Sequence, residues 1–189
     1  MKIVNILDWI ENEAVREEEI QSVLSDFSCS KNPEVENFIH NQAIDFAKRK
    51  TAITYLIYNE KDDLGGFFAV THKSITIPDN LLSKREQRRL RQYAVLENGK
   101  YVVSAFLVAQ LARNFQQADR HIIGGAELLD YCINVIEQIQ HMVGGRIIIL
   151  ECESGNAKLE EFYRRNCFRD YDNRVDKYGN RYRMFLRLL

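Results

Sequence analysis

The sequence predicts an α/β fold of the mixed-sheet (α+β) kind, with one parallel crossover at the centre of the sheet. Residues 52–58 and 64–71 are rich in β-branched and aromatic residues and flank a short polar turn, which is typical of a β-hairpin. Residues 101–152 follow as strand, helix and strand, a unit that has to be parallel and right-handed. A doubly wound nucleotide fold would need more such units.

The composition is that of one ordinary globular domain. The chain has 189 residues, 46% of them hydrophobic and 28% charged, which excludes disordered and collagen-like proteins. Twenty-six Lys and Arg against 27 Asp and Glu leave a formal net charge of −1, so the chain is not a bulk binder of nucleic acid or membrane. No Gly/Ser linker or internal repeat is present, and we expect a single domain over residues 1–189.

The sequence indicates a cytoplasmic protein. No run approaches the roughly 20 apolar residues that a membrane-spanning helix needs. The N-terminus begins like a signal peptide, but Asp8 and Glu11 interrupt its apolar stretch and no small-residue cleavage site follows. The cysteines form no CxxC pair and have no histidine at ligand spacing; they are Cys29, Cys132, Cys152 and Cys167. We therefore expect thiols in a reducing compartment, no structural metal and no membrane association.

Helices are predicted before the first strand. The acidic segment 11–24 favours a short helix. Pro33 follows a polar Ser-Lys-Asn entry and suits the first turn of the next helix. Apolar residues at helical spacing then predict one amphipathic helix over 33–48; they are Val35, Phe38, Ile39, Ala43 and Phe46.

The later elements follow from the same periodicities. The continuously apolar run 101–109 is predicted to be the buried central strand. A strong apolar stripe predicts a long helix over 124–142, which Gly144 and Gly145 end. The other predicted elements are a basic helix at 81–92, a strand at 146–152, a helix at 156–166 and closing strands near 168–173 and 181–188.

Gly124 and Gly125 stand where the long helix is predicted to begin. Glycine lets a backbone approach a ligand closely, and the N–H groups and dipole of a helix start favour an anion such as pyrophosphate. The segment is neither a P-loop, since no Lys-Ser/Thr follows, nor a GxGxxG dinucleotide fingerprint. A tight turn before a core helix explains the glycines equally well, and the residues alone leave both interpretations open.

A more specific pattern follows the strand at 146–152. It consists of Asn-Ala at 156–157, Phe-Tyr at 162–163 and Cys-Phe at 167–168. This arrangement resembles the GNAT superfamily of acetyl-CoA-dependent N-acetyltransferases, whose members carry Asn, Ala, Phe-Tyr and then a Gly-Phe step. The resemblance covers about residues 27–188, and Cys167 departs from it by replacing the glycine.

The start of the chain resembles one branch of that superfamily. Residues 27–29 followed by the helix at 33–48 look like the toxin acetyltransferases of bacterial toxin–antitoxin pairs, which acetylate the amino group of aminoacyl-tRNA. The resemblance implies a GNAT-like acyl-CoA N-acyltransferase fold with a splayed central strand pair. It implies acetyl-CoA as co-substrate and a primary amine as acceptor, with tRNA as a candidate. An antitoxin protein and a homodimer are further candidate partners.

The resemblance places the cofactor between the two parallel central strands. Ala109 and Leu111, on the strand edge 108–111, would offer backbone hydrogen bonds to the pantetheine arm in the manner of an added strand. Asn156 would hold the same arm, and it also suits the N-cap of the following helix.

The family's phosphate loop reads Gln or Arg, two residues, Gly, one residue, then Gly or Ala. In one register the loop runs from Arg120 to Gly125, and Ile123 replaces the first glycine. In the other it runs from His121 through Gly124 to Ala126 and loses the Arg or Gln. The candidate phosphate-binding residues are therefore Arg120, His121, Ile123, Gly124, Gly125 and Ala126. For His121 a surface histidine is the alternative.

The chemistry that the resemblance implies is direct transfer. Backbone N–H groups polarise the thioester carbonyl, an amine attacks, and the leaving thiolate takes a proton. Tyr163 is the candidate general acid, with a core aromatic at helical spacing as the alternative. Glu151 and Glu153 are candidate bases for the amine, with solvated carboxylates as the alternative.

A basic cluster lies in the predicted helix 81–92 and consists of Lys84, Arg85, Arg88, Arg89 and Arg91. It suits the phosphate backbone of an RNA substrate, although a solvated helix face is the commoner explanation of such a cluster. A non-catalytic GNAT-fold binding module, acting through a protein or RNA partner, is the alternative function. Ile123 in the phosphate loop favours that module, whereas the helix from Asn156 to Tyr163 favours the enzyme.

Overall fold

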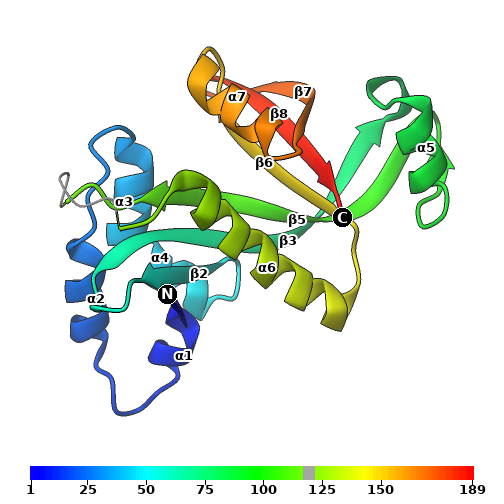
Figure 1. Cartoon of the computed structure of the whole chain (residues 1–189). Helices are drawn as coiled ribbons and strands as arrows, with labels where there is room; N and C mark the ends of the chain where they lie inside the picture. Colours follow the sequence, from blue (N-terminus) through cyan, green and yellow to red (C-terminus); the bar gives the residue numbers. More distant parts are fainter. Residues whose placement is uncertain (117–121) are drawn as a thin grey trace. The chain divides into compact units, whose positions relative to one another are not determined.

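The computed structural model describes residues 1–116 and 122–189, which form the predicted mixed α/β fold (Figure 1). Their strands make one sheet in the order β1-β2-β3-β5-β6-β8-β7, and β4 pairs with β5 outside that path. Two compact units comprise residues 1–71 with 108–139 and residues 72–107 with 140–189. The long strands β3 (Leu64–Pro78) and β5 (Lys100–Arg113) contribute to both units, and each unit is described by itself.

The first unit begins with a strand and four short helices. Strand β2 pairs antiparallel with β1 and with the first half of β3, as the predicted hairpin requires. The end of β5 and most of α6 (Gly125–Val143) complete the unit. The remaining elements are β1 (Lys2–Asn5), α1 (Ile6–Ile10), α2 (Glu17–Ser25), α3 (Pro33–Asn41), α4 (Ala43–Lys48) and β2 (Ile53–Tyr58).

The N-terminal part differs from the prediction in three places. The segment that begins like a signal peptide forms β1 and α1, and α2 starts only at Glu17 rather than at residue 11. The single helix predicted over 33–48 is wrong, because Gln42 (φ −128°) divides it into α3 and α4. The break turns the second helix, so that Phe38 of α3 and Ala47 of α4 are buried in the same core.

That core is organised around one aromatic side chain of β3. The Phe67 ring meets Phe27 edge-on at a centroid distance of 4.9 Å and lies parallel to Phe38 at 6.2 Å. Phe27 and Phe67 are almost completely buried. The loop between α2 and α3 is thereby held against the strand that leads into the centre of the sheet.

The second unit contains the parallel crossover strand. Strand β6 pairs parallel with β5 and antiparallel with β8, and β8 pairs with β7, which confirms the predicted crossover and closing hairpin. The short strand β4, the 3₁₀ helix and the full lengths of β3 and β5 were not predicted. The elements are η1 (Asp79–Leu81), α5 (Lys84–Leu90), β4 (Leu96–Glu97), β6 (Ile147–Glu153), α7 (Ala157–Arg165), β7 (Arg169–Val175) and β8 (Arg181–Leu188).

Helix α5 is held in place by contacts at its first turn and by a buried leucine near its end. Ser83 and Glu86 form a capping box, in which the Ser83 hydroxyl accepts the Glu86 N–H at 3.3 Å. Glu86 also pairs with Arg169 of β7, and Leu90 is buried. Within residues 1–116 and 122–189, no helix is both long enough and apolar enough to cross a membrane.

Gly66 lies where β3 packs tightly against the end of β5. A Cβ at this position would lie 2.7 Å from the carbonyl oxygen of Ala112 and 3.1 Å from Leu128 Cδ2. The first contact is with backbone that is itself part of a strand, so the neighbour cannot rotate away. Only glycine fits there without moving the two strands apart.

We predict that Gly66→Ala lowers the free energy of unfolding by about 1–3 kcal/mol, because the new methyl group overpacks a backbone contact. Urea denaturation of the two proteins measures the change. Gly124→Ala is the control, since a Cβ there has its nearest neighbour, Glu127 Cβ, at 4.0 Å. Equal losses in the two variants would contradict the prediction.

Candidate functional site

The parallel ladder between β5 and β6 is short. It spans the three residue pairs from Ala105↔Ile147 to Leu107↔Ile149. Strand β5 continues to Arg113, while β6 continues to Glu153 and remains paired with β8 over that length. The central strands are therefore not paired along their whole length, as expected of a strand pair whose edges receive an extended ligand.

Ala109 and Leu111 lie on the accessible face of β5. Successive strand residues point to opposite faces, which puts these two side chains on one face and Val108 and Ala112 on the other. Val108 and Ala112 are buried, whereas Ala109 is exposed and Leu111 half-buried. Of the two residues predicted as pantetheine contacts, Ala109 is therefore open to solvent and Leu111 is partly covered.

Asn114 determines how the chain leaves β5. Its side-chain oxygen accepts the Ser28 N–H at 2.9 Å, and its side-chain NH₂ donates to the Leu64 carbonyl at 3.1 Å. The same oxygen accepts the Gln116 N–H at 3.0 Å, and the Asn114 main-chain N–H donates to the Gly65 carbonyl at 2.8 Å. One side chain therefore joins the end of β5, the start of β3 and the loop after α2.

Sequence analysis missed Asn114. It stands in a polar segment without periodicity, and its partner Ser28 is 86 positions away in the chain. The neighbouring Phe115 also joins two distant segments. Lys31 Nζ lies 4.8 Å and Arg113 Cζ 5.2 Å from its ring centroid.

The glycines stand at the start of α6, as predicted. Gly124 is exposed, the helix begins at Gly125, and the Gly124 N–H points toward Glu127 Oε2 at 3.5 Å. Ile123 is only 3% exposed and lies beside Gly65, so its side chain belongs to the core and only its main chain is available to a ligand. Ala126 is exposed in the first helical turn. Arg120 and His121 lie outside the described residues.

Asn156 is the N-cap of α7. Its side-chain oxygen accepts the Leu159 N–H at 3.2 Å, which is the capping role considered from the sequence. The residue is exposed at the end of the turn that follows β6. Capping uses one lone pair of the amide oxygen and neither N–H, so hydrogen-bonding capacity is left for a ligand.

Tyr163 lies in an aromatic cluster on the inner side of α7. It is 6% exposed, and its ring centroid is 5.4 Å from that of Phe185 and 6.0 Å from that of Phe168. This is the packing expected of a core aromatic. The cluster fixes the ring in place, and the acid role of its hydroxyl stays a prediction.

Glu151 is engaged by an arginine. Arg174 Nε and Nη2 donate to its two carboxylate oxygens at 2.8 and 2.6 Å. This two-point contact occupies both carboxylate oxygens with a cation. Glu151 would act as a base only after this contact opens. Glu153, two residues on, is exposed.

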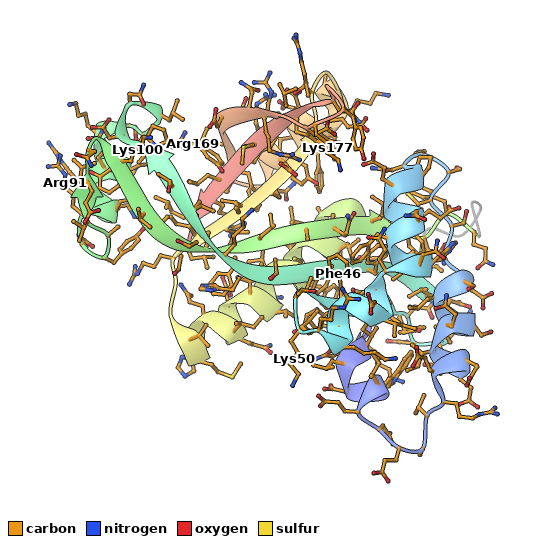
Figure 2. All side chains as sticks on the ribbon, turned by 180° about the vertical axis from the view of Figure 1, so that it is seen from behind. Phe46, Lys50, Arg91, Lys100, Arg169 and Lys177 are labelled. Carbon is orange, nitrogen blue, oxygen red and sulfur yellow. The ribbon has the colours of Figure 1, made fainter. Side chains whose placement is uncertain are left out.

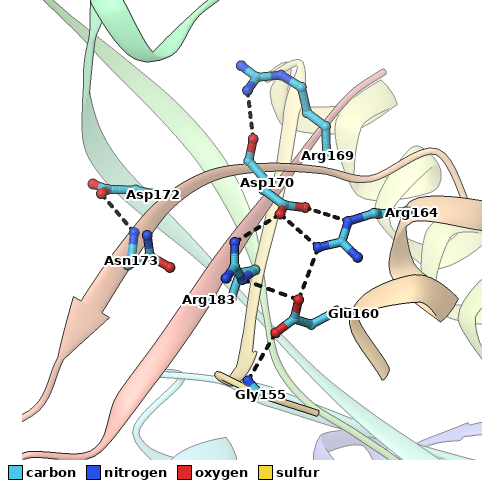
Figure 3. A network of polar contacts seen from close by, with 8 residues as sticks. All are labelled: Gly155, Glu160, Arg164, Arg169, Asp170, Asp172, Asn173 and Arg183. Carbon is cyan, nitrogen blue, oxygen red and sulfur yellow. Dashed lines mark hydrogen bonds and ion pairs between the residues drawn. The ribbon is translucent and has the colours of Figure 1, made fainter. Parts of the chain in front are cut away.

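Four charged side chains form a closed network beside α7 (Figure 3). Glu160 and Asp170 each contact both Arg164 and Arg183. A hydrogen bond from the Gly155 N–H, aided by the two arginines, lowers the pKa of Glu160, and Arg164 lowers the pKa of Asp170. The sequence showed an arginine-rich C-terminal part but not that its arginines meet these carboxylates.

The basic cluster is arranged differently. All five of its cations are exposed on or just after α5, and Figure 2 labels Arg91 and Lys100 in this part of the second unit. Within the described residues none of the five forms an ion pair, although Arg91 Nε donates to Tyr101 Oη at 3.1 Å and Arg89 Nη2 to the Leu189 carbonyl at 3.2 Å. We call Lys84, Arg85, Arg88, Arg89 and Arg91 the α5 basic surface.

Solved structures match the chain, whereas no protein-family model and no curated protein sequence does. AtaT complexed with acetyl-methionyl-tRNAfMet has a TM-score of 0.63 at 16% identity, over 96% of this chain and 92% of that one. A bacterial toxin matches with a TM-score of 0.63 at 12% identity, over 87% and 82% of the two chains. The chain has the GNAT-like fold of these toxins. A Tyr-to-Phe mutant of KacT also matches, with a TM-score of 0.61 at 15% identity over 87% and 86%.

We predict that Asn114→Ala accelerates amide hydrogen exchange of Ser28 by about tenfold or more, because its N–H loses a hydrogen-bond partner. Hydrogen–deuterium exchange over residues 27–29 measures the effect. Asn41→Ala serves as control, since the Asn41 side chain donates only to the exposed Asn37 side chain on the same helix. Unchanged exchange at 27–29 would show that Asn114 does not hold this loop.

Proposed function

We propose that this protein is an acetyl-CoA-dependent N-acetyltransferase that acetylates a primary amine, with aminoacyl-tRNA as the favoured acceptor. We further propose that it acts as a single domain in the cytoplasm. The observation that carries the proposal is the short β5–β6 ladder, in the same fold as AtaT. AtaTR has been solved bound with acetyl-CoA, and it matches with a TM-score of 0.59 at 14% identity over 99% of this chain and 92% of that one.

The cofactor role is divided among main-chain groups. In this proposal the backbone at Ala109 and Leu111 holds the pantetheine arm, and Asn156 holds it through its side-chain amide. The first turn of α6, at Gly124 to Ala126, takes the pyrophosphate on its free N–H groups. Ile123 contributes its main chain only. Arg120 and His121 are proposed to reach the same phosphates.

The transfer step needs one acid and one neutral amine. The amine nitrogen bonds to the thioester carbon, the carbon–sulfur bond breaks, and the Tyr163 phenol gives its proton to the leaving thiolate. The acceptor amine must lose a proton in the same reaction. Glu151, released from Arg174, is the proposed base.

The α5 basic surface supports an RNA acceptor. Arg165 and Arg174 of the second unit pair with carboxylates, whereas the five cations of this surface form no ion pair within the described residues. Exposed cations that are not paired in this way are available to phosphate groups. A Tyr-to-Phe mutant of AtaT bound to the C-terminus of the antitoxin AtaR also matches, with a TM-score of 0.59 at 14% identity over 96% of this chain and 91% of that one, so an antitoxin is proposed as a protein partner. A homodimer is proposed from the resemblance alone.

A second function has one observation in its favour. The Glu127 carboxylate lies at the start of α6, where it places negative charge at the N–H groups proposed to bind pyrophosphate. A GNAT-fold module without acetyl-CoA binding would tolerate this charge. Isothermal titration with acetyl-CoA separates the two functions: saturable heat supports the enzyme, and no heat at millimolar cofactor leaves the module.

We predict that Tyr163→Phe lowers kcat by about 10²- to 10⁴-fold and leaves the Kd for acetyl-CoA nearly unchanged, because only the proton donor is removed. Steady-state kinetics and calorimetry measure the two quantities. The matched control is Tyr178→Phe, which alters a tyrosine that is 77% exposed. A turnover equal to that of the wild type would refute the acid role.

We predict that the protein transfers labelled acetyl groups to charged tRNA. The double variant Arg85→Gln/Arg88→Gln should bind this tRNA more weakly and reduce the slope of log Kd against log salt by about 2, one for each lost phosphate contact. Arg49→Gln, which removes an exposed arginine paired with Asp45 in the first unit, is the control. Label found only on free polyamines or protein would count against the RNA acceptor.

A further inference from the structure

Glu160 is the one charged residue buried within the described parts of the chain, at 7% relative exposure. It lies on the inner side of α7, between Asn156 and Tyr163 in sequence. Its neighbour Glu161 is exposed and pairs with Arg165 at 2.8 Å across one helical turn. Burial of a carboxylate costs free energy unless hydrogen bonds and opposite charges surround it.

The contacts of Glu160 reach out of its own helix (Figure 3). Oε1 accepts the Gly155 N–H at 3.1 Å, in the turn that connects β6 to α7. Oε2 accepts Arg164 Nη2 at 3.0 Å and lies 3.3 Å from Arg183 Nε, on strand β8. One carboxylate thus connects the start of α7, its last turn and the neighbouring strand.

Asp170 closes the network from the other side. Arg164 donates to its two oxygens at 3.0 and 2.9 Å, and Arg183 Nη1 donates at 3.1 Å. Asp170 does not contact the turn after β6. The two carboxylates therefore share both arginines, but only Glu160 holds the backbone at Gly155.

Gly155 needs such a contact. Its φ of +93° lies in the region that other residues rarely adopt, and a Cβ there would have no atom within 4 Å. Two hydrogen bonds hold the backbone of this turn, one from the Gly155 N–H to Glu160 and one from the Ser154 N–H to the Arg181 carbonyl at 2.9 Å. The next residue is Asn156, so the Gly155 contact fixes the backbone just before it, while the cap to the Leu159 N–H holds its side-chain oxygen.

We propose that Glu160 is a positioning residue for cofactor binding: by holding Gly155 it orients Asn156 toward the pantetheine arm of acetyl-CoA. This inference rests on the proposed function. A buried ion pair by itself is weak evidence for a stabilising role, because desolvation offsets much of the attraction. Tyr163 packs against Phe168 and Phe185, and Arg164 Cζ lies 6.0 Å from the Phe185 ring centroid. Because Glu160 itself contacts the turn at Gly155, we expect loss of its carboxylate to affect binding more than the chemical step.

The test compares Glu160→Gln with Glu161→Gln, a substitution of the same kind one position further along. Glu160→Gln should weaken acetyl-CoA binding by about tenfold, the effect of one lost charge-assisted contact, while kcat changes by less than about threefold. Amide exchange at residues 154–156 should become faster in Glu160→Gln and stay unchanged in Glu161→Gln, because a neutral amide oxygen accepts the Gly155 N–H more weakly than a carboxylate does. Glu161→Gln should match the wild type in all three measurements.

Two further variants separate positioning from stability. Asp170→Asn breaks the same network without touching Gly155, so it should lower the melting temperature and leave the acetyl-CoA Kd unchanged. Glu160→Asp keeps the charge near the arginines but is one methylene too short for Gly155, and it should weaken binding as Glu160→Gln does. If Glu160→Gln fails to fold, Glu160→Asp carries the test.

An unchanged Kd and unchanged exchange at 154–156 in the Glu160 variants would overturn the inference. Equal losses of affinity in Asp170→Asn and Glu160→Gln would also overturn it, since they would indicate a stabilising role only. If the wild-type protein neither binds acetyl-CoA nor transfers its acetyl group, the proposed function is refuted instead. In that case amide exchange at residues 154–156 alone tests whether Glu160 holds the turn.

Discussion

Main-chain pairing between β5 and β6 ends after Leu107↔Ile149. The contacts of the end of β5, and the site proposed there, depend on this early end of the ladder. Strand main chain that leaves a ladder has to satisfy its polar groups elsewhere, through other strands, side chains or a ligand. Beyond the ladder, the end of β5 lies against β3 at Gly66 and is tied by Asn114 to the loop after α2. The strand edge proposed to receive acetyl-CoA is thus supported by the close packing at Gly66 and by the side-chain hydrogen bonds of Asn114.

Charge is used in two ways in the second unit. Around α7, arginines and carboxylates meet in a closed network, and their effect is to hold backbone and helix in one arrangement. On α5, the cations face solvent without carboxylate partners within the described residues. A near-neutral total charge conceals this contrast, because local arrangement and not net charge decides which cations are free for a polyanion.

Local patterns predicted the elements with the strongest periodicity. The hairpin of β2 and β3, the parallel crossover and helix α7 all follow from runs whose partners are adjacent in the sequence or joined by one helix. The helix over 33–48 was predicted as one piece because the apolar spacing continues across Gln42, where the backbone departs from helical geometry. Strand β1 escaped notice because four residues are too few to show a period.

The sequence by itself determined the order of the longer elements, the helix starts next to Gly124 and Asn156, and the resemblance to toxin acetyltransferases, since these depend on spacing along the chain. Only the tertiary structure decided that Ile123 is a core residue and that Arg174 pairs with Glu151. It also decided that Asn114 binds the loop at Ser28 and that Glu160 binds the turn at Gly155. Such contacts join residues far apart in sequence or select one of several acidic neighbours. No local periodicity encodes that choice, because it is made when the segments pack.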